Sequence, residues 1–342
     1  MNKNHPLYRE DIKNVLTTKD IELLKGKSVL ITGATGLLGL HLVDALMALG
    51  DVSVVAVGRS KSKAESRLGE YYSNHLFTFI EQDVCEPFSK DLKVDYIIPG
   101  ASNTHPLAYS RYPIETIMVN VKGAENALNL AAKCGATVLY MSTVEVYGNA
   151  CGDESFTEDY TGKLDLSTSR SCYTESKRVS EALCQSFIVE KGVDVKIVRL
   201  SRVFGPTMLE SDSKASSQFI KKAIINEAVV LKSKGEQLFS YTYASDAVAA
   251  MLYVMLHGEC GQAYNISNEK CNVYLRDFAQ MCAAYNGKSV VLAIPSEIEQ
   301  KGYSIAKQAI LDNHKLKMLG FEPIYAFDNA VTRTIKILKN EQ

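Results

Sequence analysis

The stretch Ser28-Val-Leu-Ile-Thr-Gly-Ala-Thr-Gly-Leu-Leu-Gly-Leu-His-Leu-Val-Asp-Ala-Leu46 decides the fold of this chain. Its first four residues predict a short buried strand, and its second half has an apolar helical period. Three glycines separate the two at Gly-x-x-Gly-x-x-Gly spacing. In this setting the first glycine permits a tight turn, the second lets backbone N–H groups approach a phosphate, and the third lets the helix pack closely on the strand.

This strand, turn and helix predict a site for the pyrophosphate of a dinucleotide, because the start of a helix carries partial positive charge. The alternative is a glycine turn with a structural role only. The position of the unit near the start of an alternating chain favours the dinucleotide. The residues predicted to bind the cofactor here are Gly33, Thr35, Gly36, Leu37, Leu38 and Gly39.

Composition excludes several classes of protein. The 342 residues are 46% hydrophobic and 23% charged, as in an ordinary globular protein. The formal net charge of -1 predicts no nucleic-acid or anionic-membrane partner. The eight cysteines form no Cys-x-x-Cys pair, so no metal site is expected. The polar start and the short longest apolar run, Ala247 to Leu256, predict a cytoplasmic protein with reduced thiols.

Short apolar strands alternate with helical periods through the first part of the chain, which predicts an α/β fold with a doubly wound parallel sheet. The expected strands after the first are Val52–Val57, Leu76–Ile80, Tyr96–Ile98, Thr137–Ser142 and Val195–Leu200. The regular alternation of strands and helices ends near residue 204. We therefore expect a dinucleotide-binding domain over residues 1–203, to which residues 237–267 return, and a smaller mixed α/β substrate-binding lobe over residues 204–236 and 268–342.

The second expected strand ends in Gly58-Arg59-Ser60-Lys61, about 20 residues after the glycines, where dinucleotide folds contact the adenosine ribose. A carboxylate there would accept the 2′-hydroxyl of NAD. The chain offers Arg59 instead, which favours the 2′-phosphate of NADP; the alternative is a solvated basic loop.

A second constellation carries proton-transfer chemistry. Tyr173 and Lys177 are four residues apart, so they share one helix face. A nearby ammonium, a helix N-terminus and a cationic nicotinamide would all favour the phenolate of this tyrosine. Thr143, at the end of the fifth expected strand, can hydrogen-bond the same reacting oxygen. By itself, such a pair also occurs on ordinary surface helices.

The joint pattern resembles the extended short-chain dehydrogenase/reductases, the nucleotide-sugar epimerase/dehydratase family, over nearly the whole chain. The matching motifs are Gly33-x-x-Gly36-x-x-Gly39, Asp83-Val84, Val-Asn120-Val-Lys-Gly, Ser142-Thr143-Val-Glu145-Val-Tyr147-Gly148, Tyr173-x-x-x-Lys177 and Arg199-x-x-x-x-Phe204-Gly205-Pro206. The resemblance implies that Thr143, Tyr173 and Lys177 carry the hydride-coupled proton transfer. It also implies a homodimer and further cofactor-binding residues at Asp83, Val84, Ala101, Ser102 and Asn120.

Departures from the family pattern narrow the reaction. Val144 stands where 4,6-dehydratases have an aspartate, which disfavours dehydration. The segment Arg170 to Arg178 and Glu145 are similar to UDP-glucuronate decarboxylases. Phe239, however, replaces an arginine that grips the sugar-nucleotide pyrophosphate, and Arg202 replaces the usual asparagine after the sixth strand. We predict that Arg202 compensates as a substrate-binding residue, and that Glu145 is either a proton shuttle or an acceptor for a sugar hydroxyl.

These observations predict an NAD(P)-dependent oxidoreductase acting on a nucleotide-linked hexose. The favoured hypothesis is NADPH-dependent reduction of a 4-keto-6-deoxy sugar nucleotide, of the dTDP-4-dehydro-6-deoxyglucose reductase type, for surface polysaccharide synthesis. The alternative is a redox-neutral nucleotide-sugar epimerase or UDP-glucuronate decarboxylase-like enzyme with bound NAD. A different class, a catalytically silent dinucleotide sensor, is disfavoured because Thr143, Tyr173 and Lys177 occur together.

Overall fold

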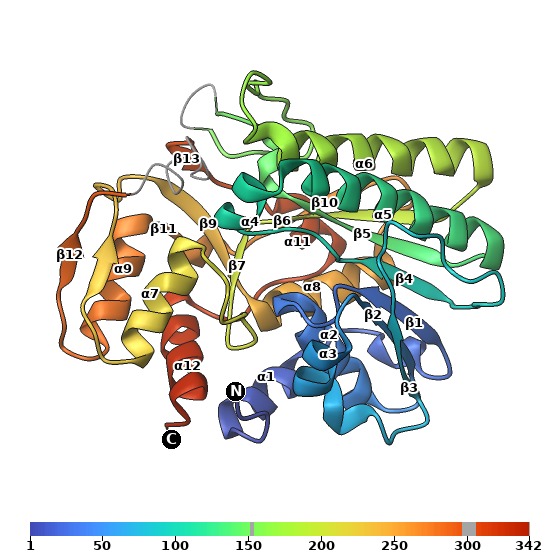
Figure 1. The fold of residues 1–342 in the computed structure, drawn as a ribbon, viewed down its shortest axis with the longest axis horizontal. Coiled ribbons are helices and arrows are strands. Elements are labelled where there is room, and N and C mark those ends of the chain that lie inside the picture. Colours follow the sequence, from blue (N-terminus) through green and yellow to red (C-terminus); the bar gives the residue numbers. More distant parts are fainter. Residues whose placement is uncertain (151–153, 296–305, 342) are drawn as a thin grey trace.

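The computed structural model describes residues 1–150, 154–295 and 306–341. Its centre is a parallel seven-stranded sheet in the order β10-β6-β5-β4-β1-β2-β3 (Figure 1). The chain moves outward from β1 in one direction and then in the other, which confirms the predicted doubly wound α/β fold. The strands are β1 (Ser28–Thr32), β2 (Ser53–Gly58), β3 (Phe77–Glu81), β4 (Tyr96–Pro99), β5 (Thr137–Thr143), β6 (Val195–Leu200) and β10 (Ala263–Ile266).

Helices cover both faces of this sheet (Figure 1). One face carries the long pair α5 (Pro113–Cys134) and α6 (Ser171–Lys191). The other face carries α1 (Pro6–Leu16), α2 (Leu37–Leu49) and α8 (Ala244–His257). Two shorter helices, α3 (Lys61–Leu68) and α4 (Pro106–Arg111), follow β2 and β4 in the chain. Another, α11 (His314–Leu319), comes near the end of the chain and contacts β10.

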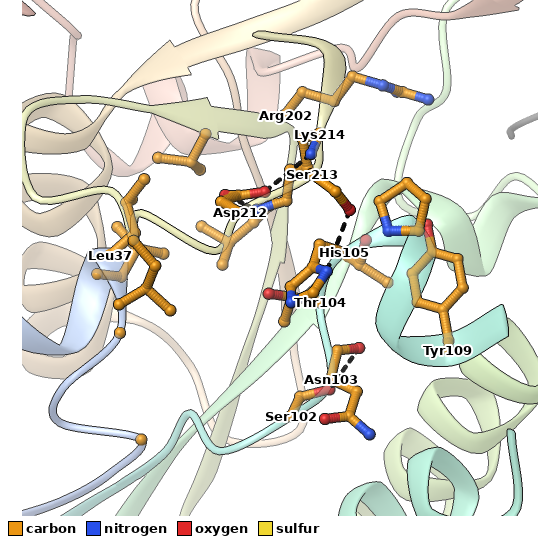
Figure 2. A pocket seen from close by; sticks show the side chains of 18 of the residues that line it. Leu37, Ser102, Asn103, Thr104, His105, Tyr109, Arg202, Asp212, Ser213 and Lys214 are labelled. Atoms are coloured by element: carbon orange, nitrogen blue, oxygen red, sulfur yellow. Dashed lines mark hydrogen bonds and ion pairs between the residues drawn. The ribbon is translucent and has the colours of Figure 1, made fainter. Parts of the chain in front are cut away.

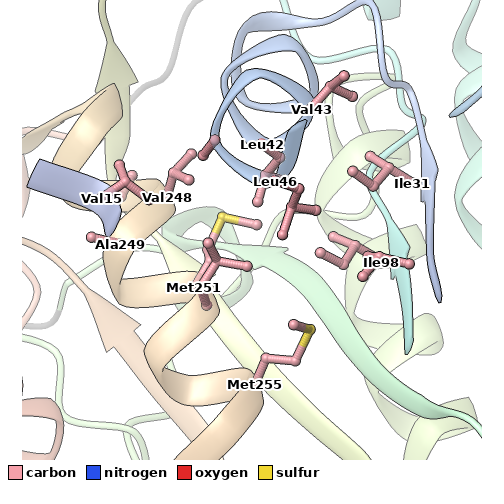
Figure 3. Packing of buried hydrophobic residues seen from close by; sticks show 14 of the residues in the cluster. Val15, Ile31, Leu42, Val43, Leu46, Ile98, Val248, Ala249, Met251 and Met255 are labelled. Carbon is pink, nitrogen blue, oxygen red and sulfur yellow. The ribbon is translucent and has the colours of Figure 1, made fainter. Parts of the chain in front are cut away.

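The core between α2, α8 and the sheet is apolar and closely packed. Leu42 and Leu46 of α2 meet Met251 of α8, and Ile31 and Ile98 face them from the strands (Figure 3). All five side chains are almost wholly buried. Burying such side chains contributes about 1.5–3 kcal/mol each, so this contact fixes α2, and with it the glycine turn, on the sheet.

A second, smaller set of strands and helices lies beside the sheet (Figure 1). Its aromatic core brings Phe204, Tyr241 and Phe327 around Phe278, with ring centroids 5.0 to 5.1 Å from that of Phe278. The strands are β7 (Arg202–Phe204), β9 (Leu238–Tyr243), β11 (Asn272–Tyr274) and β13 (Gln308–Ala309) in one sheet, and β8 (Val229–Leu231) with β12 (Val290–Leu292) in another. The helices are α7 (Ala215–Ile224), α9 (Leu275–Ala284) and α12 (Phe327–Lys339).

The expected return of residues 237–267 to the first domain is divided between the two parts. Strand β10 and helix α8 lie with the seven-stranded sheet. Strand β9 pairs with β7, β11 and β13 in the second sheet. The chain therefore passes from the second part to the first between β9 and α8, and it returns to the second part between β10 and β11.

The leading helix α1 connects the two parts. Asp11 is fully buried and accepts hydrogen bonds from the hydroxyls of Tyr243 and Tyr325 and from Arg333. Burial raises the pKa of Asp11, although the Arg333 charge acts in the opposite direction. Such a network is costly to break, because each removed partner leaves a buried polar group unpaired. Within the described residues, no helix is long and apolar enough to cross a membrane.

Candidate active site

A cavity of about 930 Å³ lies where the carboxyl ends of the central strands face the second sheet. This edge is where doubly wound sheets bind their ligands. All but one of the site residues predicted from the sequence line it: Gly33, Thr35, Gly36, Leu37, Leu38, Gly39, Arg59, Asp83, Val84, Ala101, Ser102, Thr143, Glu145, Tyr173, Lys177 and Arg202.

The glycine turn fits a dinucleotide. Gly33 has a φ of 69°, and a side chain there would lie 2.8 Å from the carbonyl oxygen of Gly100. A side chain on Gly39 would collide with the Gly33 carbonyl oxygen. In the described chain no side chain caps the start of α2 at Gly36, so the first N–H groups of this helix remain open where the cavity begins. These open donors and the helix dipole suit a pyrophosphate.

Arg59 lies at the end of β2 and lines the cavity, as the sequence predicts. Its guanidinium donates a hydrogen bond of 2.8 Å to Glu115 of α5 and lies 3.8 Å from the carboxylate of Asp83. The cation expected to bind a 2′-phosphate is therefore already shared between two carboxylates.

Tyr173 and Lys177 stand in the first turns of α6, facing the end of β5. Burial raises the pKa of Tyr173 to about 12, and a hydrogen bond with Thr143 acts in the opposite direction. Burial also lowers the pKa of Lys177 to about 8, against the opposing charge of Glu181. The Lys177 ammonium donates to the carbonyl oxygen of Met141, 2.8 Å away, which holds it beneath the cavity.

Glu145 is the centre of a charge cluster beside Tyr173. Its carboxylate lies 2.7 Å from a terminal nitrogen of Arg170 and 3.7 Å from one of Arg202. Burial acts to raise the pKa of Glu145, but the two arginines outweigh it and hold the pKa below its usual value. Nε of Arg170 and Nη1 of Arg202 are buried and have no hydrogen-bond partner among the described residues. Both N–H groups thus keep an unused capacity to donate a hydrogen bond.

Arg202 and Phe239, two residues that depart from the family pattern, are in contact. The guanidinium carbon of Arg202, on β7, lies 3.5 Å from the centre of the Phe239 ring, on β9. Strands β7 and β9 are hydrogen-bonded neighbours. Arg202 thus lies beside the position of the missing arginine, as the predicted compensation requires, and Phe239 supports its guanidinium through a cation–π contact. The compensation itself stays a prediction.

Asn120 is the predicted residue that does not line the cavity. Its side-chain amide donates a 2.8 Å hydrogen bond to the Ser176 hydroxyl, and its backbone carbonyl oxygen accepts a hydrogen bond from the Ser180 hydroxyl. Asn120 thus joins α5 to α6 behind Tyr173. Its predicted role as a cofactor-binding residue stays a prediction.

Sequence reasoning did not single out two residues of this site. Arg170 belongs to the decarboxylase-like segment, so its position three residues before Tyr173 was an available signal. Tyr109, of α4, stacks on Tyr173 with ring centroids 5.7 Å apart, and Arg170 lies over its ring. Nothing in the local sequence around Tyr109 indicates that contact.

Residues 205–214, which we call the crossing segment, contribute Leu209, Asp212, Ser213 and Lys214 to the lining of the cavity. At one end, Thr207 donates to the carbonyl oxygen of Leu37 at the start of α2 and accepts from Arg67 of α3. At the other end, Ser213 lies 3.2 Å from Nδ1 of His105, next to α4 (Figure 2). The crossing segment is therefore tied to α2 and α3 at one end and to the residue before α4 at the other.

Comparison with known proteins agrees with this geometry. Residues 29–267 match the NAD dependent epimerase/dehydratase family, and the chain belongs to that family. It is thus an enzyme of the extended short-chain dehydrogenase/reductase type. The UDP-glucuronic acid decarboxylase 1 of Xenopus tropicalis is 31% identical over 316 residues, which are 92% of this chain and 73% of that protein.

Two solved structures share the fold. One is the UDP-glucose 4-epimerase of Thermotoga maritima with UDP-glucose, at 22% identity and a TM-score of 0.79, covering 92% of this chain and 99% of that one. The other is the UDP-glucuronic acid 4-epimerase of Bacillus cereus with UDP-glucuronic acid and NAD, at 21% identity, a TM-score of 0.79 and the same coverage.

Proposed function

We propose that this enzyme converts a nucleotide-linked uronic acid in a redox-neutral reaction with retained NAD, and that the reaction is decarboxylation. One observation carries the proposal: Arg170 and Arg202 converge on Glu145 beside Tyr173, and each keeps a buried N–H group without a partner among the described residues. A buried, unpaired N–H group of a cation is costly unless a ligand completes it. The carboxylate and the pyrophosphate of a nucleotide-linked uronic acid are anions that would do so.

The relatives support the same choice. The similar curated proteins include UDP-glucuronic acid decarboxylases of a frog and of a fish, each matched over 92% of this chain. The segment around Arg170 and Tyr173 and the presence of Glu145 agree with them. These findings favour the redox-neutral alternative over the reductase that the sequence favoured.

The chain supplies the proton transfers. The glycine turn of Gly33, Gly36 and Gly39 would hold NAD, which would supply a reversible acceptor for a hydride of the sugar. Tyr173 would take the proton of the 4-hydroxyl at its phenol oxygen and return it at the end. Because burial raises the pKa of Tyr173 to about 12, the phenolate needs positive charge nearby, and Lys177 stands one helical turn further along α6.

Loss of carbon dioxide follows from the 4-keto group. The electron pair of the bond to the departing carboxylate moves toward the keto oxygen, where the hydroxyls of Thr143 and Tyr173 would stabilise the developing charge. A proton taken up from water is then added to the ring carbon that lost the carboxylate, which balances the conversion of the carboxylate into neutral carbon dioxide. Carbon dioxide leaves uncharged, so Arg170 would position the carboxylate rather than accelerate its loss. Arg202 would hold the pyrophosphate.

A redox-neutral reaction requires that the cofactor stay bound between its two hydride transfers. The crossing segment supports retention, because Thr207 and Ser213 tie it to α2 and to the residue before α4. An enzyme that consumes NADPH would have to open this crossing in every turnover. Reduction of a 4-keto sugar remains the second candidate, and Arg59 at the cavity is the observation that favours it.

The test is incubation of the purified protein with UDP-glucuronate, without added NADPH, followed by mass spectrometry of the sugar nucleotide. We expect a product lighter by one carbon dioxide and no net change in absorbance of reduced nicotinamide. UDP-glucose, which lacks the carboxylate, is the matched control and should be left unchanged in mass. NADPH oxidation with a 4-keto sugar, together with an unreacted uronate, would reject the proposal in favour of the reductase.

A further inference from the structure

Three segments meet at the adenosine end of the cavity. Arg59 follows β2, Asp83 follows β3, and Glu115 lies in the first turn of α5. Arg59 donates to Glu115 at 2.8 Å and lies 3.8 Å from Asp83. Arg59 and Asp83 line the cavity, and Glu115 reaches the same guanidinium from α5.

The positive and negative charges of the side chains at this end of the cavity are equal in number. Arg59 and the cavity-lining Lys63 contribute two positive charges, and Asp83 and Glu115 contribute two negative ones. The 2′-phosphate of NADP carries nearly two negative charges at neutral pH, since the second pKa of such a phosphate is about 6. It would compete with Glu115 for Arg59 and be repelled by both carboxylates. A 2′-hydroxyl is neutral and can itself donate a hydrogen bond to a carboxylate.

We propose that Glu115 is a specificity-determining residue that occupies Arg59 and thereby directs this enzyme toward NAD and against NADP. The inference rests on the proposed function in one respect, the use of NAD as the cofactor. It also explains why Arg59 at the end of β2 need not indicate NADP. The charge that decides the preference is the carboxylate of Glu115, which lies 56 residues further along the chain.

The pair is suited to substitution. The side chains of Arg59 and Glu115 keep 55% and 38% of their surface exposed, so the ion pair contributes little to folding stability. Glu115→Gln keeps the size and removes the charge. Glu125→Gln is the matched control, because Glu125 lies on the same helix, is 39% exposed and pairs with a cation of its own, Lys122.

The experiment measures dissociation constants of NAD, NADH, NADP and NADPH by calorimetry with the full-length chain stripped of nucleotide. The wild type and Glu125→Gln should prefer NAD and NADH. Glu115→Gln should bind NADP and NADPH roughly tenfold more tightly, as Coulomb's law gives for a doubly charged group about 6 Å from one carboxylate in water-like surroundings. Affinity for NAD should change far less, because its ribose carries no charge there.

A double variant identifies the acceptor of the phosphate. If Glu115 acts through Arg59, the gain in NADP affinity should disappear when Glu115→Gln is combined with Arg59→Gln. The proposal is overturned if the wild type binds NADP as tightly as NAD, if Glu115→Gln gains nothing, or if Glu125→Gln gains as much.

These binding constants need no turnover. An enzyme that fails to decarboxylate UDP-glucuronate but shows the Glu115 effect would reject the proposed reaction alone. An enzyme that decarboxylates with NAD but shows no Glu115 effect would reject this inference alone.

Discussion

Replacing Arg202 by alanine tests whether this residue, which we predict to take the place of the arginine missing at Phe239, holds the substrate. In the structure the Arg202 guanidinium is supported by the Phe239 ring at 3.5 Å and by Glu145 at 3.7 Å, and its side chain is 19% exposed. A hydrogen bond to a charged group contributes about 1.5–3 kcal/mol, so Arg202→Ala should weaken sugar-nucleotide binding by roughly 10- to 150-fold. Affinity for the dinucleotide should stay unchanged, because we propose that Arg202 contacts the sugar nucleotide and not the dinucleotide.

Arg202→Ala should also raise the pKa of Glu145. Arg170 and Arg202 together hold the pKa of Glu145 below its usual value, so removing one cation must raise it. If ionised Glu145 is needed for turnover, the acidic limb of the pH–rate profile of Arg202→Ala shifts to higher pH. The assay is therefore a set of KM and kcat values across pH, with separate titrations of the cofactor.

A control variant and a double variant that restores the charge complete the test of Arg202. Arg276 also stacks on an aromatic ring, that of Tyr274 at 4.6 Å, and is 45% exposed, so Arg276→Ala should leave KM unchanged. Combining Arg202→Asn with Phe239→Arg returns the charge to β9 and should recover much of the lost affinity. Equal losses for substrate and cofactor, or no loss for either, would refute the reasoning.

Three further predictions concern catalysis, retention and acid stability. Tyr173→Phe should lower kcat by about 10²–10⁴ and leave cofactor binding nearly intact, since it removes only the proton-transferring oxygen; wild-type turnover in this variant would exclude that role. Ser213→Ala should speed exchange of bound nucleotide against labelled NAD by freeing one end of the crossing segment, and an unchanged exchange rate would show that the contact does not retain the cofactor. Burial lowers the pKa of His41 to about 3. Between pH 6.5 and pH 3 the His41 imidazole therefore stays neutral in the folded protein, whereas in the unfolded chain it binds a proton. The free energy of unfolding then decreases as the pH falls, by about 2 kcal/mol at pH 5. His41→Phe should lose less of its melting temperature between pH 7 and pH 5 than the wild type does, and parallel losses in both proteins would contradict this.

The sequence by itself determined the parts of this protein that are local in the chain. The strand, glycine turn and helix from Ser28 to Leu46 are specified by apolar periods and by glycine spacing, and they appear as β1 and α2. Tyr173 and Lys177 share a face because helical geometry places residues four apart on one side. Thr143 could be assigned to the same site, because the carboxyl ends of parallel strands meet at one edge of a sheet.

Only the tertiary structure decided which charges meet. Arg202 and Phe239 become neighbours through the pairing of β7 with β9, which no local pattern predicts. Glu115 reaches Arg59 because α5 begins beside the ends of β2 and β3. Because of this contact, Arg59 at the end of β2 no longer indicates a preference for NADP. The physical reason is that a hydrogen bond or ion pair depends on distances of a few ångströms between side chains, and the packing of helices on the sheet sets those distances.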